Sequence, residues 1–328
     1  MTSTKNVRDH AIDELRGILP AWNTSRDSHV KLLSLSENAV YLVENTILSQ
    51  PFIVRVHRSG YNTKSEIESE LIWLKALGDE TKVKLSVPIP GQCGAFIQRL
   101  PNGDSAVAFE FVRGRHPASE QEILGTLNYL GATAGQFHQH ARDWERPPGF
   151  VRKIWNFPRC LGDAAIWGNW REAPSLSKKN IMDLEPVVRV LETHLETFGC
   201  GPDRFGLIHG DMKLANVLIS KDGFHVIDFD DCGYCWFLYD YGCAMTGLDV
   251  GSAAKTRTQA WVSGYRRMAD LSKEDEEMLP TFSLLRRFMT MAWAGSHTDS
   301  PNASGEFGAQ YSMETLVIAE EYLNEHSC

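Results

Sequence analysis

The sequence predicts an α+β protein of two lobes, a small β-rich lobe followed by a larger helical one. Strand-like runs dominate up to about residue 112, and helical periodicity dominates after it. The polar segment "RGRHPASEQE" joins the two stretches. We therefore assign residues 1–112 to the first lobe and 113–328 to the second. A cleft between two such lobes is a preferred place for a ligand.

The first lobe should contain a helix, a β-meander, a second helix and two further strands. Residues 7–18 carry apolar residues near helical spacing. The runs "VKLLSLS", "AVYLVEN" and "PFIVRVHR" are β-type and are separated by turn-like segments, which predicts an antiparallel meander. The run "SEIESELIWLKALGDE" predicts a helix that the prolines of "VPIP" close. Its apolar face is formed by Ile67, Leu71, Leu74 and Leu77. The runs "AFIQRL" and "AVAFEFV" complete the lobe.

The second lobe should be mostly helical. "SEQE", from Ser119 to Glu122, is a capping-box signature, and the apolar spacing after it predicts a long core helix. A tryptophan-rich stretch separates this helix from another, "DLEPVVRVLETHLETFG". The runs "NVLIS" and "HVIDF" flank "SKDG" and predict a hairpin. From about residue 251 the pattern is helical throughout, with Ser272 and Asp275 as one capping pair.

Composition limits the classes of function. The chain has 328 residues, 43% of them hydrophobic, which suits a globular protein. Neither an apolar run of about 18 residues nor a secretory h-region is present, so we expect no membrane span. The net charge of −9 without a basic block disfavours nucleic acid as a partner. Seven scattered cysteines favour a reducing compartment, and we predict a cytoplasmic location. The oligomeric state is left open.

Polar residues gather at strand ends in "LIHGDMKLANVLISKDGFHVIDFD", residues 207–230. Asp211 follows an apolar run, Asn216 comes five positions later where the hairpin begins, and Asp228 ends its second strand. An amide oxygen and a carboxylate are the hard ligands that Mg²⁺ uses together with substrate phosphates. Asp211 is then free to accept or orient a hydroxyl proton. This pattern predicts a phosphoryl-transfer site.

Neighbouring residues have plainer interpretations. Cys232 and Cys235 form a C-x-x-C followed by Cys243, but without a second pair we expect ordinary thiols rather than a zinc site. We expect Asp230 and Asp231 to begin a solvated turn, with a role at a second metal ion as the alternative. His138 is expected to be a helix-capping or core histidine.

"HGDMKLAN" followed by "VIDFDD" resembles the H-G-D-x-x-x-x-N and I-D motifs of the aminoglycoside phosphotransferase and choline kinase-like family, which has the bilobal fold of protein kinases. Homoserine kinase type II is similar. The resemblance extends from about residue 30 to 300. It includes "ENAVYLVE" as the nucleotide loop, "FIVRVHR" and "SELIWLKAL" as the strand and helix of a basic–acidic pair, "FEFVRGR" as the hinge, and "LYDYG".

The resemblance implies a role for each matching residue. Asp211 is implied as the catalytic base or hydroxyl-orienting group, Lys213 as a contact to the γ-phosphate, and His209 and Asp240 as braces of the loop. The implied Mg²⁺ ligands are Asn216 and Asp228. The implied ATP contacts are Ser36 and Asn38 in the loop 36–39 over the phosphates, Arg55 paired with Glu70 at the α/β-phosphates, and the backbone from Glu110 to Val112 at the adenine. Arg55 stands where many relatives have Lys, and its guanidinium can bind phosphate oxygens in bidentate fashion.

The function implied is an ATP- and Mg²⁺-dependent kinase that phosphorylates a hydroxyl of a small polar molecule. The acceptor is left open among aminoglycosides, amino alcohols, hydroxy amino acids and sugars, as is the use of GTP. One alternative is a Ser/Thr protein kinase of the bacterial stress-response type, which Lys213 favours and the short segment between Asp228 and Tyr239 disfavours. Another is a nucleotide-binding pseudokinase, which the presence of Asp211, Asn216 and Asp228 disfavours.

Several residues fall in segments that line the acceptor side in the family, and they are Trp155, Trp167, Trp170, Trp293, Arg286 and Arg287. A tryptophan face can hold a cation or a sugar, but helix packing is the simpler role and the one we expect. Two acidic residues downstream, Asp249 and Glu306, are candidates for recognition of an amine, with a solvated surface position as the alternative.

Overall fold

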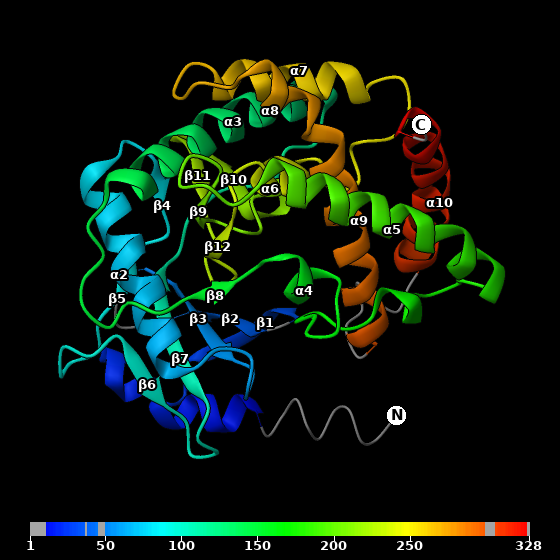
Figure 1. Ribbon diagram of the computed structural model, residues 1–328. Helices are drawn as coiled ribbons and strands as arrows, with labels where there is room; N and C mark the ends of the chain where they lie inside the picture. Colours follow the sequence, from blue (N-terminus) through cyan, green and yellow to red (C-terminus); the bar gives the residue numbers. More distant parts are fainter. Residues whose placement is uncertain (1–10, 37, 45–49, 299–305, 327–328) are drawn as a thin grey trace. The chain divides into compact units, whose positions relative to one another are not determined.

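The structure is a computed structural model that describes residues 11–36, 38–44, 50–298 and 306–326. The chain divides into two compact units. One is formed by the residues up to Gly114 together with Gly149–Val151, and the other by Arg115–Pro148 and the chain from Arg152 onward. Figure 1 labels the elements of both. An antiparallel sheet lies in the first unit and most of the helices lie in the second, which confirms the predicted α+β class.

The first unit is built on an antiparallel sheet. Its strands run in the order β1 (His29–Leu35), β2 (Asn38–Glu44), β3 (Phe52–His57), β7 (Ser105–Glu110) and β5 (Pro88–Ile89), and β6 (Ile97–Arg99) also pairs with β7. The predicted meander is confirmed. The two-residue strand β5 was not predicted, because it contains a proline, which sheets tolerate only at an edge.

The apolar core of this unit includes residues from the N-terminal helical segment. Residues 11–18 are helical, η1 (Leu19–Trp22) continues them, and the predicted residues 7–10 lie outside the described part. Leu15, Leu19 and Trp22 are buried in one cluster with Val43 and Val54 of the sheet. An apolar helix face therefore meets the apolar side chains of the strands, as the sequence periodicity requires.

Helix α2 (Lys64–Glu80) agrees with its prediction except in how it ends. A capping box between Thr63 and Glu66 begins it. Its four predicted apolar residues are all buried. The expectation that the prolines of "VPIP" close the helix is wrong. The helix ends at Glu80, where the extended Thr81 donates its hydroxyl to the carbonyl of Leu77 at 2.6 Å. The chain then forms β4 (Lys84–Leu85) before the first proline.

In the second unit, α3 (Glu120–Asp143) and α7 (Ala254–Tyr265) lie side by side (Figure 1). The predicted capping box of Ser119 and Glu122 begins α3. The two helices meet at glycines, since a Cβ on Gly131 would lie 2.0 Å from the carbonyl oxygen of Trp261. Helix α5 (Lys178–Phe198) starts earlier than predicted, because Ser177 and Asn180 form a capping box there.

Two small β-structures position the polar loop, which is the segment 209–216 between β9 and β10. β10 (Val217–Ser220) and β11 (Gly223–Val226) form the predicted hairpin. A three-stranded sheet has the order β8 (Lys153–Ile154), β12 (Gly233–Trp236) and β9 (Phe205–Ile208). β8 and β12 were not predicted, because they are short and lie far from each other in sequence. The other elements are α4 (Phe157–Cys160), η2 (Trp170–Glu172), η3 (Leu214–Asn216), α6 (Tyr239–Ala244), α8 (Lys273–Glu277), α9 (Leu279–Ser296) and α10 (Glu306–His326).

No described helix combines the length and the apolar character that a bilayer span requires. Cys232, Cys235 and Cys243 are buried. Burial raises the pKa of the Cys235 and Cys243 thiols. Within the described ranges no group of three His, Cys, Asp or Glu side chains gathers as a metal cluster. Because they are buried, the three cysteines are core residues.

Candidate active site

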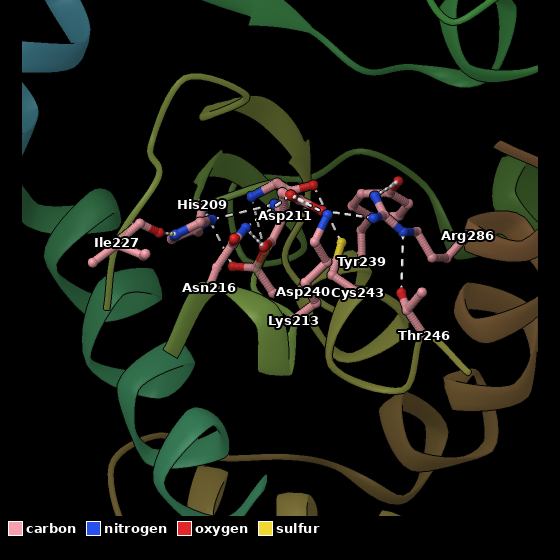
Figure 2. Close-up of polar contacts among 11 residues, drawn as sticks. His209, Asp211, Lys213, Asn216, Ile227, Tyr239, Asp240, Cys243, Thr246 and Arg286 are labelled. Atoms are coloured by element: carbon pink, nitrogen blue, oxygen red, sulfur yellow. Dashed lines mark hydrogen bonds and ion pairs between the residues drawn. The ribbon is translucent and has the colours of Figure 1, made fainter. Parts of the chain in front are cut away.

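The polar loop after β9 is held by one buried carboxylate. Asp240, on α6, accepts hydrogen bonds from the backbone N–H of Gly210 at 2.9 Å and of His209 at 3.3 Å (Figure 2). Gly210 has φ +80°, and a Cβ there would lie 2.6 Å from the carbonyl oxygen of Asp231. Only glycine fits this close approach. The loop conformation is thus fixed by Asp240 and Gly210 before any reacting group is considered.

His209 supports this loop as a neutral ring. Its Nε2 donates to the carbonyl of Ile227 at 3.2 Å, and its Nδ1 accepts the N–H of Asp211 at 3.2 Å. Burial lowers the pKa of His209, although the nearby Asp240 and Asp211 oppose the shift. With one nitrogen donating and the other accepting, both ring nitrogens are engaged by the backbone. His209 therefore braces the loop.

His138 is buried next to Asp240, the residue that holds the polar loop. Its Nε2 lies 3.2 Å from Oδ2 of Asp240 and its Nδ1 lies 3.0 Å from the hydroxyl of Tyr265. Burial lowers the pKa of His138 against the opposing effect of Asp240. A neutral ring can donate to the carboxylate and accept from the phenol, so His138 is a core residue that orients Asp240.

The Asp211 carboxylate lies at the centre of the polar cluster in Figure 2. Its Oδ1 accepts from Nη2 of Arg286 at 2.6 Å, and its Oδ2 accepts from Nζ of Lys213 and Nδ2 of Asn216, both at 2.8 Å. Burial alone would raise the pKa of Asp211, but Lys213 and Arg286 outweigh it and lower the pKa below its ordinary value. Asp211 is therefore ionised at neutral pH and is a weak base.

Asn216 has the right atom available for a metal ion. Its Nδ2 donates to Oδ2 of Asp211 and also to the backbone carbonyl of Asp211 at 2.9 Å, which sets the orientation of the amide. Its Oδ1 accepts no hydrogen bond from the described residues. A fixed amide oxygen of this kind is a suitable ligand for Mg²⁺ or Ca²⁺.

Asp228, the other predicted ligand, follows β11 in a left-handed backbone conformation with φ +67°. Such strain in a residue other than glycine typically costs about 1–3 kcal/mol and gathers at functional sites. Burial would lower the pKa of Lys213, but Asp211 and, more weakly, Asp228 raise it, which places the Asp228 carboxylate near that ammonium. The amide oxygen of Asn216 and the carboxylate of Asp228 are together suitable ligands for a divalent ion that also binds phosphates.

The predicted basic–acidic pair of the first unit is present. Nη2 of Arg55, on β3, donates to Oε1 of Glu70, on α2, at 2.5 Å, and both side chains are almost fully buried. The ring of Phe109 lies 5.0 Å from the guanidinium. A buried carboxylate and an aromatic face together hold the Arg55 cation in one place.

The other predicted nucleotide contacts also lie in this unit. Ser36 donates its N–H to the carbonyl of Asn38 at 3.0 Å, and residue 37 between them lies outside the described ranges. Glu110 ends β7, and its N–H donates to the carbonyl of Val87 at 2.8 Å. Val112 lies beyond the strand, and the described residues offer its N–H no hydrogen bond. Val112 is thus an available hinge donor, whereas the N–H of Glu110 is not.

Arg286 is the residue that sequence reasoning missed at this site. It lies on α9, and the sequence indicated only that its segment faces the acceptor. Its contact with Asp211 joins residues 75 positions apart, so no local motif could have shown it. Arg287 points elsewhere, because it binds both carboxylate oxygens of Asp249 at 2.6 and 2.7 Å. Asp249 is therefore neither solvated nor free to bind an amine; the side chain of Glu306 is not described.

Asp230 and Asp231 do not begin a solvated turn, and that expectation is wrong. Both residues are buried. The carbonyl of Asp230 accepts from the guanidinium of Arg152, and the carbonyl of Asp231 accepts from Nε1 of Trp155 at 3.1 Å. The unpredicted pairing of β8 with β12 draws this turn into the interior.

The tryptophans mainly pack the core, as expected. Trp155, Trp167 and Trp170 are buried. Trp167 packs edge-on against Trp155, and its ring lies 5.1 Å from the guanidinium of Arg286. The cation against this tryptophan is thus one of the protein's own. Trp293 is half-buried and stacks on His297 at 5.2 Å.

The sequence profile of the phosphotransferase enzyme family matches residues 29–271. Amicoumacin kinase of Bacillus subtilis (strain 168) is 24% identical over 284 residues, which cover 82% of this chain and 80% of that protein.

Solved structures are similar as well. A microcompartment-associated aminopropanol kinase is 36% identical, with a TM-score of 0.86, and the match covers 95% of this chain and 97% of that one. An amicoumacin kinase in complex with AMP-PNP, Ca²⁺ and Ami is 20% identical, with a TM-score of 0.75, over 97% and 96% of the two chains.

The chain therefore belongs to the phosphotransferase enzyme family, and the resemblance seen in its motifs is confirmed. It is therefore a phosphotransferase. The similar proteins are kinases of small molecules by name, and one of them was solved with AMP-PNP and Ca²⁺. The protein kinase alternative gains no support from these relatives. The pseudokinase alternative required loss of a reacting residue, and Asp211, Asn216 and Asp228 are all present.

Proposed function

We propose that this enzyme is a Mg²⁺-dependent kinase for a small amino alcohol, with Asp211 as the group that orients the acceptor hydroxyl. The observation that carries the role of Asp211 is its buried, ionised carboxylate, held by Asn216, Lys213 and Arg286. The acceptor class is suggested by the 36% identity to an aminopropanol kinase over 95% of the chain.

The low pKa of Asp211 bears on how it would act. Phosphoryl transfer has a loose transition state in which positioning and charge stabilisation matter more than early proton removal. A weak base is sufficient there, because Asp211 needs only to hold the hydroxyl by a hydrogen bond and accept its proton late. Its carboxylate is already ionised, so no prior deprotonation is required.

The charge on the transferring group would be offset from the loop. Asn216 Oδ1 and the Asp228 carboxylate would hold Mg²⁺, which supplies charge neutralisation at the β- and γ-phosphates when bound. The Lys213 side chain is 33% exposed, and its ammonium would turn from Asp211 toward the γ-phosphate.

The first unit would supply the nucleotide contacts. Arg55, fixed by Glu70, would donate to the α/β-phosphates, and the N–H of Val112 would bind the adenine edge. The segment with Ser36 and Asn38 would cover the phosphates, and Glu110 would mark the start of the hinge. Residues 1–112 would thus form the nucleotide-binding lobe and residues 113–328 the catalytic and acceptor lobe.

A second acceptor class is favoured by different relatives. Two amicoumacin kinases are similar to the chain, although only at 24% and 20% identity. An antibiotic hydroxyl is therefore the runner-up acceptor. We continue to predict a cytoplasmic location, because seven cysteines scattered along the chain suit a reducing compartment.

The test is a transfer assay with γ-labelled ATP and Mg²⁺ on a panel of 1-amino-2-propanol, ethanolamine, choline, homoserine and amicoumacin. We expect labelled product with the small amino alcohols and a loss of about 10²–10⁴-fold in turnover for Asp211→Asn. Asp270→Asn, which changes an exposed carboxylate of the same unit, should leave turnover unchanged. Label on amicoumacin alone would replace the acceptor class, and near wild-type turnover of Asp211→Asn would refute its role.

A further inference from the structure

Arg286 lies in the interior of the second unit with every nitrogen of its guanidinium in use. Nη2 donates to Oδ1 of Asp211 at 2.6 Å, Nη1 to the hydroxyl of Tyr239 at 3.2 Å, and Nε to Oγ1 of Thr246 at 3.3 Å. Its side chain is only 4% exposed. Figure 2 shows these contacts converging from the side opposite His209. The guanidinium is thus fixed in position by groups other than Asp211.

The packing of α6 against α9 places this guanidinium. The two helices touch at Gly242, where a Cβ would lie 2.3 Å from the carbonyl oxygen of Phe282 and 3.2 Å from Cβ of Arg286. Helix α6 also carries Tyr239 and the loop brace Asp240. One helix therefore supports both the backbone of the polar loop and the cation that reaches its carboxylate.

The two cations on Asp211 differ in mobility. Lys213 reaches Oδ2 from two residues along the same loop and is 33% exposed on a flexible stem. In the proposed reaction it turns toward the γ-phosphate. Arg286 is buried instead, and each of its three guanidinium nitrogens donates to a group of the second unit. The contact to Oδ1 is thus the one that persists during turnover.

We propose that Arg286 is a positioning residue for the transfer reaction, and this role rests on the proposed role of Asp211. Arg286 holds the Asp211 carboxylate by Oδ1 and leaves Oδ2 for the acceptor hydroxyl. Oδ2 is the suitable oxygen, because it faces Lys213 and Asn216 and hence the expected place of the γ-phosphate and the metal ion. Arg286 is not required to touch either substrate.

The test compares Arg286→Met and Arg286→Lys with Arg287→Met as the matched control. Arg287 is the neighbouring buried arginine, and its contacts go to Asp249 and Thr315 rather than to Asp211. We expect Arg286→Met to lower kcat by about 10²-fold, with KM for ATP within about twofold of wild type, because a misplaced reacting group impairs the transfer step. Arg286→Lys should restore part of kcat. Arg287→Met should lower the unfolding temperature but keep kcat where it is folded.

The outcomes distinguish the role of Arg286 from the role of Asp211. A wild-type kcat for Arg286→Met, or an equal loss of kcat in Arg287→Met, overturns the inference and leaves the role of Asp211 intact. Wild-type turnover of Asp211→Asn, measured in parallel, overturns the proposed function itself. If Arg286→Met does not fold, Arg286→Lys decides: a loss of kcat at unchanged ATP KM supports positioning, and an unchanged kcat contradicts it.

Discussion

Gly242→Ala should damage the active site without changing any polar group in it. The added Cβ would lie 2.3 Å from the carbonyl oxygen of Phe282, whereas such contacts essentially never fall below 3.0 Å. Helices α6 and α9 must then separate by at least the difference, 0.7 Å. The bond from Arg286 to Asp211, now 2.6 Å, would lengthen to about 3.3 Å by the same displacement, beyond the usual range for such a bond.

The expected magnitudes follow from this displacement. Overpacking against backbone atoms costs about 1–3 kcal/mol. At about 2–4 °C per kcal/mol for a unit of this size, the unfolding temperature should fall by about 2–12 °C. Because Asp211 loses its fixed partner, kcat should fall by about tenfold or more while KM for ATP changes little.

The assay is thermal unfolding together with kcat and KM for the purified variant. Gly125→Ala is the matched control, because Gly125 also lies in a helix of the second unit and a Cβ there meets nothing within 4 Å. It should raise stability by about 0.5–1 kcal/mol through helix propensity. If Gly242→Ala unfolds and turns over like the wild type, the tight α6–α9 contact does not control the site.

Two further predictions concern buried charged groups. Glu70→Ala should destabilise the first unit by about 3–5 kcal/mol, because the buried guanidinium of Arg55 loses its carboxylate partner. The double change Arg55→Met with Glu70→Leu should recover much of the stability in urea unfolding but not ATP binding, and recovery of both would contradict the phosphate role. His138 has a pKa lowered by burial, so the stability it contributes is present above about pH 6.5 and is lost as the pH falls through the lower folded pKa. The stability advantage of the wild type over His138→Asn should therefore shrink from pH 7.5 to 5.5, and a constant difference would refute the assignment.

The sequence determined the features that depend on neighbours along the chain. The capping boxes at Ser119 and Ser272, the β1–β3 meander and the β10–β11 hairpin each follow from a few adjacent residues, because side-chain period and turn chemistry are local. The same holds for Asp211, Lys213 and Asn216, which lie within one loop and were expected to act together.

Only the tertiary structure decided which distant residues complete the site. Arg286 comes from a helix 75 residues after Asp211, and the burial of Asp230 and Asp231 depends on β8, which lies far earlier in the chain than β12. Neither leaves a periodic or motif signal, because a buried polar contact is defined by the packing of whole elements rather than by spacing. The sequence thus specified the reacting loop, and the packing of α6 against α9 supplied the cation that holds its carboxylate.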